Sequence, residues 1–198
     1  MPGVIDSGGS GDNMYFSWEQ GAVHFVSMSS ETAIDVANFD EDEVAWLVDN
    51  LKSVDRNRTP WLIVHFHRPM YCNKDSDCDK PATRLRSEVE ALFFDFKVDL
   101  VLTGHVHSYE RSYPVFDGTV VTTSYTAPGA PVYILQGASG NREGNNGEYP
   151  PLSELSEWTA ATSVEIGYGI MSVSSTQIDW TFYSSASGEA LDRFVLSK

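Results

Sequence analysis

The sequence predicts an α/β fold in which a parallel pair of strands with a crossover helix is followed by a β-rich tail. Two nearly all-apolar runs, "PWLIVHF" at 60–66 and "VDLVLTG" at 98–104, are typical of strands buried on both faces of a sheet. Residues 83–97 between them carry apolar side chains at helical spacing. Strand, helix and strand in this order predict a parallel pair joined by a right-handed crossover.

The remaining elements follow from local patterns. Residues 14–30 alternate apolar and polar side chains around Gln20-Gly21, which predicts a hairpin. Asp40 and Glu43 form a capping box, and a helical stripe follows it: Val44, Leu47, Val48, Leu51 and Val54. Strand-like runs separated by Gly, Ser and Asn turns then occupy 131–137, 168–174, 177–184 and 190–196, with a hairpin expected at 185–190. Residues 1–13, rich in glycine and serine, are expected to form an irregular arm.

Composition restricts the function classes. The 198 residues are 41% hydrophobic, enough for one domain with a sizeable core. The formal net charge of -15 disfavours binding to nucleic acid or to an anionic membrane surface. An anionic small molecule could be held only where bound cations or other local positive charge reverse the field. No apolar run approaches the roughly 20 residues that span a bilayer.

Two features concern the cellular compartment. Cys72 and Cys78 share a polar loop without C-x-x-C spacing, which favours a disulfide over a zinc site, with two free thiols as the alternative. Asn57-Arg58-Thr59 is a glycosylation sequon, which fits a secretory route. The first residues carry none of the features of a signal peptide.

Four histidines fall into two clusters at the ends of the two buried strands. His65 and His67 follow one strand, and His105 and His107 follow the next. Carboxyl ends of parallel strands meet at one edge of a sheet, where ligands bind, so the clusters are expected to converge. Imidazoles one residue apart suit a binuclear metal centre, which stabilises the attacking and leaving oxygens of phosphoryl transfer. His65, one pleat inside the strand, is interpreted as supporting the ligands from behind or as part of the core, and His24, within the hairpin, as structural.

Three segments together, "PWLIVHFHRPMYC", "VDLVLTGHVHSYERSYPV" and "PVYILQGASGNREG", resemble the purple acid phosphatases of the calcineurin-like metallophosphoesterase superfamily. The resemblance extends from about Tyr15 to the end of the chain. It implies a metallophosphoesterase-type β-sandwich flanked by helices (αββα). It also implies iron and a second divalent ion (Zn, Mn or Fe), and hydrolysis of phosphate monoesters at acidic pH.

Motif by motif, the resemblance assigns metal ligands. Val64-His65-Phe66-His67 resembles V-x-x-H, so His67 would bind the divalent ion. Gly104-His105-Val106-His107 resembles G-H-x-H, so His105 would join His67 and His107 would bind the iron. Glu110 and Arg111 would either order this loop or the ligands, or form a surface or structural ion pair. The substrate-binding histidine pair of plant relatives has no counterpart between Arg68 and Gly104.

Other family motifs are missing. Asp6-Ser7-Gly8 and Gly11-Asp12-Asn13-Met14-Tyr15 match D-x-G and G-D-x-x-Y by letter. In the family these motifs follow buried strands and lie far apart, whereas here they are adjacent in a glycine-rich arm, so we interpret them as chance matches. No G-N-H occurs. Residues 14–198 are therefore predicted to be the carboxyl-terminal part of a single domain whose amino-terminal part, with some metal ligands, is missing.

The isolated chain is accordingly expected to be inactive or nearly so, as part of an acid phosphatase that is secreted, vacuolar or lysosomal at full length. One alternative is another metallophosphoesterase, such as a phosphodiesterase or nucleotidase, which shares the histidine motifs. A second alternative is a non-catalytic binding fragment on the same scaffold. The sequence does not predict the oligomeric state.

Overall fold

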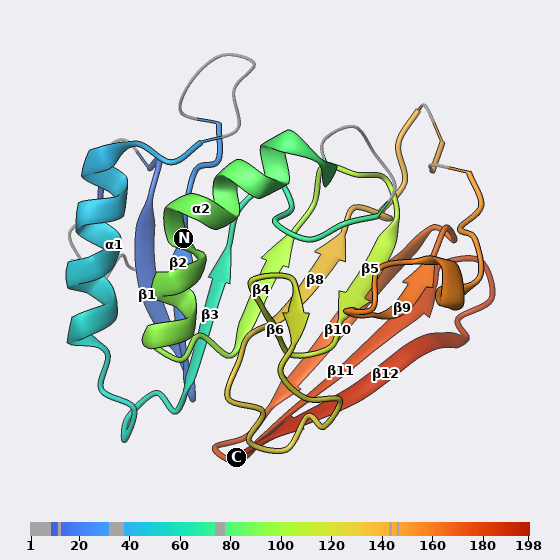
Figure 1. The fold of residues 1–198 in the computed structure, drawn as a ribbon. Coiled ribbons are helices and arrows are strands. Elements are labelled where there is room, and N and C mark those ends of the chain that lie inside the picture. The colour runs from blue at the N-terminus through green and yellow to red at the C-terminus, as the bar shows by residue number, and fades with distance from the viewer. Residues whose placement is uncertain (1–8, 12, 32–37, 74–77, 143, 146) are drawn as a thin grey trace.

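The computed structural model describes residues 9–11, 13–31, 38–73, 78–142, 144–145 and 147–198, which form three layers (Figure 1). The helices are α1 (Glu41–Ser53) and α2 (Lys80–Asp95), and Leu152–Glu154 forms a 3₁₀ turn. The large sheet has the order β1-β2-β3-β4-β8-β5-β9. Its strands are Phe16–Gln20, Val23–Ser27, Trp61–His65, Leu100–Thr103, Val132–Gln136, Tyr109–Ser112 and Thr159–Ser163 in that order.

A small antiparallel sheet forms the third layer. It consists of β10 (Gly167–Val173), β11 (Gln177–Ser184) and β12 (Ala190–Ser197). The short strands β6 (Val115–Phe116) and β7 (Thr119–Val120) pair separately. The predicted fold class is thus confirmed as a mixed sheet with helices and a stacked second sheet. Within the described residues both α-helices pack on the large sheet, so they supply one of the two outer layers of αββα.

Strand β3, which lies inside the large sheet, shows why a continuous apolar run is needed. Leu62 and Val64 of β3 pack with the helices, whereas Trp61 and Ile63 pack with the small sheet. Because successive side chains point to opposite faces, a strand between two apolar layers needs apolar residues at every position. β2, β3, β4 and β8 are parallel, which confirms the predicted parallel pair.

Helix α1 begins as predicted but with half of the expected capping box. The Asp40 carboxylate accepts a hydrogen bond from the Glu43 N–H at 2.7 Å. The Glu43 carboxylate does not return to Asp40; it accepts from the Ser29 N–H at 2.6 Å and is fully buried. Helix α2 starts at Lys80, earlier than the expected 83, with Pro81 in its first turn, where no intrahelical donor is lost.

The sequence patterns missed two strands of the large sheet. β5 reads "YERS" and β9 reads "TAATS", and neither alternates apolar and polar residues. All four residues of β5 are nevertheless buried, because partners elsewhere in the chain satisfy its polar groups. The expected arm falls largely on residues 1–8 and 12, which lie outside the described residues. No helix among the described residues combines the length and apolar character that a membrane crossing requires.

Candidate metal centre

Backbone hydrogen bonds bring the two histidine segments together where β3 and β4 end. The Phe66 N–H donates to the Leu102 carbonyl oxygen at 3.2 Å, which extends the parallel pairing past the last strand residue. The Gly104 N–H then donates to the His67 carbonyl oxygen at 2.8 Å. The ladder therefore fixes His67 beside the turn that carries His105.

The imidazoles of His67 and His105 face each other. His105 Nδ1 lies 3.0 Å from His67 Nε2, and the ring centroids are 4.9 Å apart at an interplanar angle of 81°. Two nitrogens that bind one zinc-like ion at about 2.0–2.1 Å and subtend roughly a right angle lie about 3 Å apart. The pair therefore fits as two neighbouring ligands of a single ion.

The backbone of His105 is held in the left-handed region, with a φ of 68°. A non-glycine residue there costs about 1–2 kcal/mol. Hydrogen bonds from the Val106 N–H to the Gly104 carbonyl at 2.9 Å and from the Ser108 N–H to the Val106 carbonyl at 2.8 Å maintain the turn. Strain of this kind is concentrated at functional sites, and here it aims an imidazole at His67.

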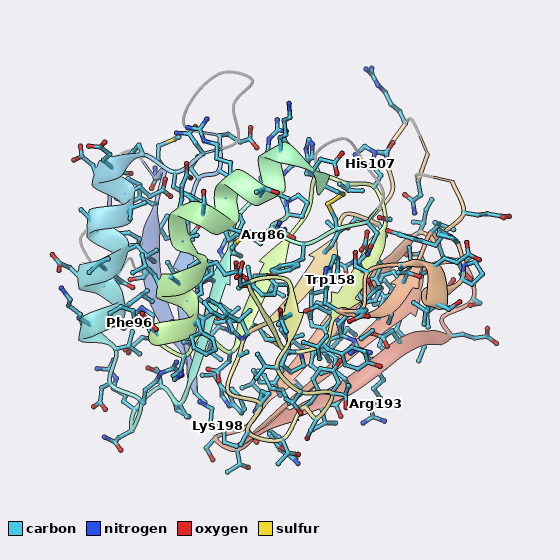
Figure 2. All side chains as sticks on the ribbon, in the orientation of Figure 1. Arg86, Phe96, His107, Trp158, Arg193 and Lys198 are labelled. Atoms are coloured by element: carbon cyan, nitrogen blue, oxygen red, sulfur yellow. A yellow bond between two sulfur atoms is a disulfide. The ribbon has the colours of Figure 1, made fainter. Side chains whose placement is uncertain are left out.

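His107 lies on the same edge of the large sheet, toward which the arrows of β3, β4 and β8 point (Figures 1 and 2). Its side chain is partly buried. Across the described ranges, no three His, Cys, Asp or Glu side chains gather around one possible ion position. The geometry thus unites two of the three histidines predicted to bind metal.

The turn between the two histidines is packed tightly from behind. Val106 is buried against Cys72 and Leu135, with Cys78 partly buried beside them. Cys72 and Cys78 form the expected disulfide. A Cβ atom on Gly137 would lie only 1.8 Å from the Val106 carbonyl oxygen, so only glycine permits this approach. The disulfide and the β8 end therefore support the turn that presents His105 and His107.

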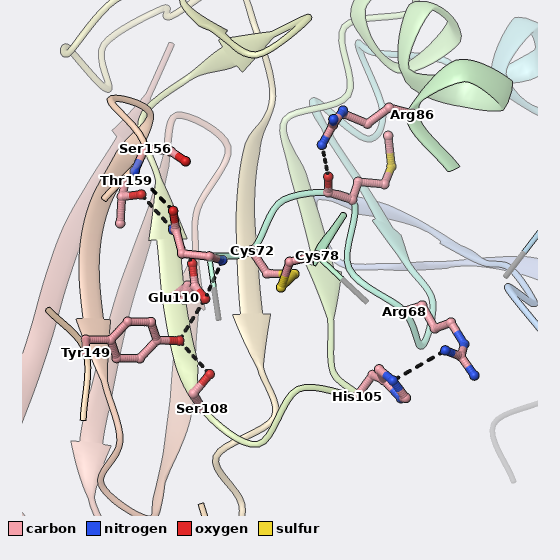
Figure 3. The surroundings of a disulfide bond; sticks show 12 residues. Arg68, Cys72, Cys78, Arg86, His105, Ser108, Glu110, Tyr149, Ser156 and Thr159 are labelled. Atoms are coloured by element: carbon pink, nitrogen blue, oxygen red, sulfur yellow. Dashed lines mark hydrogen bonds between the residues drawn. A yellow bond between two sulfur atoms is a disulfide. The ribbon is translucent and has the colours of Figure 1, made fainter. Parts of the chain in front are cut away.

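A buried carboxylate connects this turn to two other segments (Figure 3). Glu110, at 2% exposure, accepts from the Asn73 N–H at 3.0 Å and Nδ2 at 2.7 Å, and from the Tyr149 hydroxyl at 2.7 Å. Because Tyr149 donates to Glu110, the Ser108 hydroxyl donates to Tyr149 across 2.6 Å. Burial is the largest cause that raises the pKa of Tyr149 above its usual value, which keeps it a donor.

Arg111 forms a buried structural ion pair, the second of the alternatives expected for it. Its Nε and Nη2 lie 2.6 Å and 2.8 Å from the Asp192 carboxylate oxygens, in a bidentate arrangement. The guanidinium also stacks over Phe194, and the Tyr109 hydroxyl donates to Asp192 at 2.7 Å. Glu110 and Arg111 are therefore not surface residues, and they point to opposite sides of β5.

Arg68 directly follows His67 in the sequence and lies beside His105 (Figure 3). Its Nη1 is 3.4 Å from His105 Nε2, and its Nε donates to Glu31 Oε1 at 2.7 Å. The backbone N–H of Arg68 donates to the Ser30 hydroxyl at 2.9 Å. Sequence reasoning did not assign Arg68, although its place next to a predicted ligand was an available signal.

The histidines interpreted as structural are packed within the fold. His24 is buried, and its Nε2 lies 3.0 Å from Asn50 Oδ1. His65 packs edge-on against Trp18 at 5.6 Å between ring centroids, and burial lowers its pKa. The apparent D-x-G and G-D-x-x-Y matches involve Asp6 to Gly8 and Asp12, which lie outside the described residues. Tyr15 packs against Trp46 of α1 at 5.0 Å between ring centroids.

Comparison with known proteins gives a consistent result. The calcineurin-like phosphoesterase family profile matches residues 6–109, and the profile described as iron/zinc purple acid phosphatase-like protein C matches residues 130–193. Purple acid phosphatase 18 of Arabidopsis thaliana is 37% identical over 93% of this chain and 40% of its own length. Acid phosphatase type 7 of Danio rerio is 34% identical over 81% of this chain and 41% of its own length.

The fold comparison agrees with the sequence comparison. A purple acid phosphatase from yellow lupin seeds superimposes with a TM-score of 0.77 at 21% identity, over 92% of this chain and 32% of the lupin chain. The chain thus spans about 40% of the length of the curated relatives it matches. Because its profile matches residues 6–109, over half of the chain, the chain belongs to the calcineurin-like phosphoesterase family, and its carboxyl-terminal part matches the purple acid phosphatase-like profile.

Proposed function

We propose that this chain is the carboxyl-terminal part of an acid phosphatase that hydrolyses phosphate monoesters at a binuclear metal centre. The observation that carries the proposal is the 3.0 Å approach of His67 Nε2 and His105 Nδ1 at the carboxyl ends of β3 and β4. The family resemblance supplies the reaction class, and the paired imidazoles supply the corresponding chemistry.

The proposed ligands are His67 and His105 for the second divalent ion, which is Zn, Mn or Fe, and His107 for the iron. Neutral imidazole nitrogens suit all of these ions. When bound, a metal pair stabilises charge on the attacking and leaving oxygens of phosphoryl transfer. The protein contributes the turn around His105, whose strained backbone and buried support hold the two ligand nitrogens in place.

Two further parts of the proposal concern the chain as a whole. Residues 14–198 form the carboxyl-terminal part of a single metallophosphoesterase domain, following an irregular arm at 1–13. The full-length protein is a secreted, vacuolar or lysosomal glycoprotein. Two observations support this location: Asn57 is exposed in the turn between α1 and β3, and Cys72 is bridged to Cys78.

Phosphatase assays of two polypeptides test the proposal. This chain is compared with a form extended upstream through a G-N-H motif, using p-nitrophenyl phosphate at acidic pH. We expect turnover only in the extended form, and we expect His67→Ala and His105→Ala to abolish it together with bound metal. Arg84→Gln, in an exposed pair with Glu88 on α2, is the control. Equal turnover by both polypeptides, or full metal content in both histidine variants, would contradict the proposal.

A further inference from the structure

Arg68 is a partly buried cation next to the proposed metal ligands. Its side chain is 19% exposed, and its Nη1 lies 3.4 Å from His105 Nε2. It follows His67 immediately, so the segment after β3 carries both a proposed ligand and the guanidinium. Any group held by His67 and His105 would have this charge as a neighbour.

The position of Arg68 is fixed at both its backbone and its side chain. Pro69 restricts the preceding residue to extended conformations, and the Ser30 hydroxyl accepts from the Arg68 N–H at 2.9 Å. Glu31 accepts from Nε at 2.7 Å, while the Nη1 edge faces His105. The guanidinium therefore approaches the histidine pair in a defined orientation.

A guanidinium at this position would add to the positive charge of the proposed metal ions when a phosphate group binds. The net charge of -15 repels an anionic ester, so the site must supply positive charge locally. The segment between Arg68 and Gly104 contains no histidine that could supply it. A planar guanidinium offers paired donors that match phosphate oxygens and remains charged at any working pH.

We infer that Arg68 binds a terminal oxygen of the substrate phosphoryl group and thereby favours monoesters over diesters. A monoester phosphate presents three terminal oxygens and a diester only two, so a contact to the third oxygen is available only in the monoester. The inference rests on the proposed function, because it identifies the substrate class of the same site. It adds a substrate-contacting residue to a site so far described only by histidines.

Kinetics of the extended form provide the first test. We expect Arg68→Gln to reduce kcat/KM for p-nitrophenyl phosphate about 10- to 100-fold, the effect of losing a charge-assisted hydrogen bond. The loss for bis(p-nitrophenyl) phosphate should be smaller, and Arg68→Lys should lie between wild type and Gln for the monoester. Metal content should stay that of the wild type. Equal losses for both esters, or no loss for the monoester, would overturn the inference.

Phosphate binding gives a second test that does not depend on turnover. The Arg68 Nε–H resonance, identified by its absence in Arg68→Gln, is followed while the zinc-loaded chain is titrated with inorganic phosphate. We expect the Arg68 resonance to shift with phosphate until it saturates, in the wild type and in Arg84→Gln. Other resonances that shift with phosphate in the wild type should no longer shift in Arg68→Gln. No shift at Arg68, or the same phosphate affinity in Arg68→Gln, would overturn the inference. If phosphate binds through Arg68 but the extended form shows no turnover, the proposed function is wrong while the role of Arg68 in phosphate binding stands.

Substitution of Glu31 distinguishes phosphate binding by Arg68 from a purely structural ion pair between Arg68 and Glu31. If Arg68 acts only through its ion pair with Glu31, Glu31→Gln and Arg68→Gln should weaken phosphate binding equally. If Arg68 contacts phosphate, Glu31→Gln should retain binding, since it removes a competing carboxylate and leaves the guanidinium. Equal loss in the two variants would contradict the inference.

Discussion

At the scale of single residues, Glu43 shows how one side chain can set a pH dependence. Its carboxyl group is fully buried at the start of α1, and its Oε2 has no hydrogen-bond partner in the described structure. Burial is the largest cause that raises its pKa to about 7, although the Ser29 N–H hydrogen bond opposes the shift. The folded protein therefore retains the Glu43 proton at pH values where an unfolded chain has released it.

The first prediction concerns stability between about pH 4.5 and pH 7. The native state binds the Glu43 proton more tightly than the unfolded state, so the free energy of unfolding falls as pH rises through this window. The decrease should approach about 3 kcal/mol, the equivalent of the pKa difference. Urea unfolding at a series of pH values measures it. Glu43→Gln should remove this part of the pH dependence and Glu41→Gln, in the same helical turn, should not; an unchanged profile in Glu43→Gln would refute the assignment.

At the scale of elements, the sequence predicted the helices and strands whose residues carry their own local pattern. The runs that became β3 and β4 are apolar throughout, and the capping residue Asp40 identified the start of α1. β5 was not predicted, because its polar residues are buried only through partners far along the chain, such as Asn73 for Glu110. Parallel-strand topology predicted the approach of His67 and His105, whereas the position of Arg68 depends on Ser30 and Glu31 of a separate loop.

The disulfide segment and β5 should act as one unit. The bridge between Cys72 and Cys78 spans a separation of 6 residues, so removing it should lower the free energy of unfolding by about 2 kcal/mol. Cys72 also packs on Val106, so Cys72→Ser with Cys78→Ser should accelerate hydrogen exchange at the Asn73 N–H, which donates to Glu110, and at the Ser108 N–H. The Trp61 N–H, which donates to the Ala22 carbonyl oxygen at the opposite end of β3 from the histidines, is the internal control. Equal acceleration at all three amides would show general destabilisation instead.

At the scale of the whole molecule, a buried polar cluster joins the two sheets. Arg111 belongs to β5 of the large sheet and Asp192 to β12 of the small sheet, and their side chains are 7% and 12% exposed. Tyr109 donates to the same carboxylate and accepts from Trp180 Nε1 at 3.1 Å. Around this cluster the sheets pack mainly through apolar side chains, with a further polar contact where Trp61 Nε1 donates to the Ser174 carbonyl oxygen. Because apolar layers can slide, this cluster specifies how β12 aligns with β5.

The last prediction follows from the burial of the ion pair between Arg111 and Asp192. Asp192→Asn leaves the Arg111 cation buried without its counter-charge, which should lower the free energy of unfolding by about 3–5 kcal/mol. Arg111→Met together with Asp192→Asn removes both charges and keeps an acceptor for the Tyr109 hydroxyl, so its loss should be smaller than the sum of the single losses. Urea unfolding of the four proteins in a double-mutant cycle measures this coupling. Asp179→Asn, which breaks the exposed pair with Arg193 on the same small sheet, should change little. Additive losses at Arg111 and Asp192 would mean that this ion pair does not help to hold the two sheets in register.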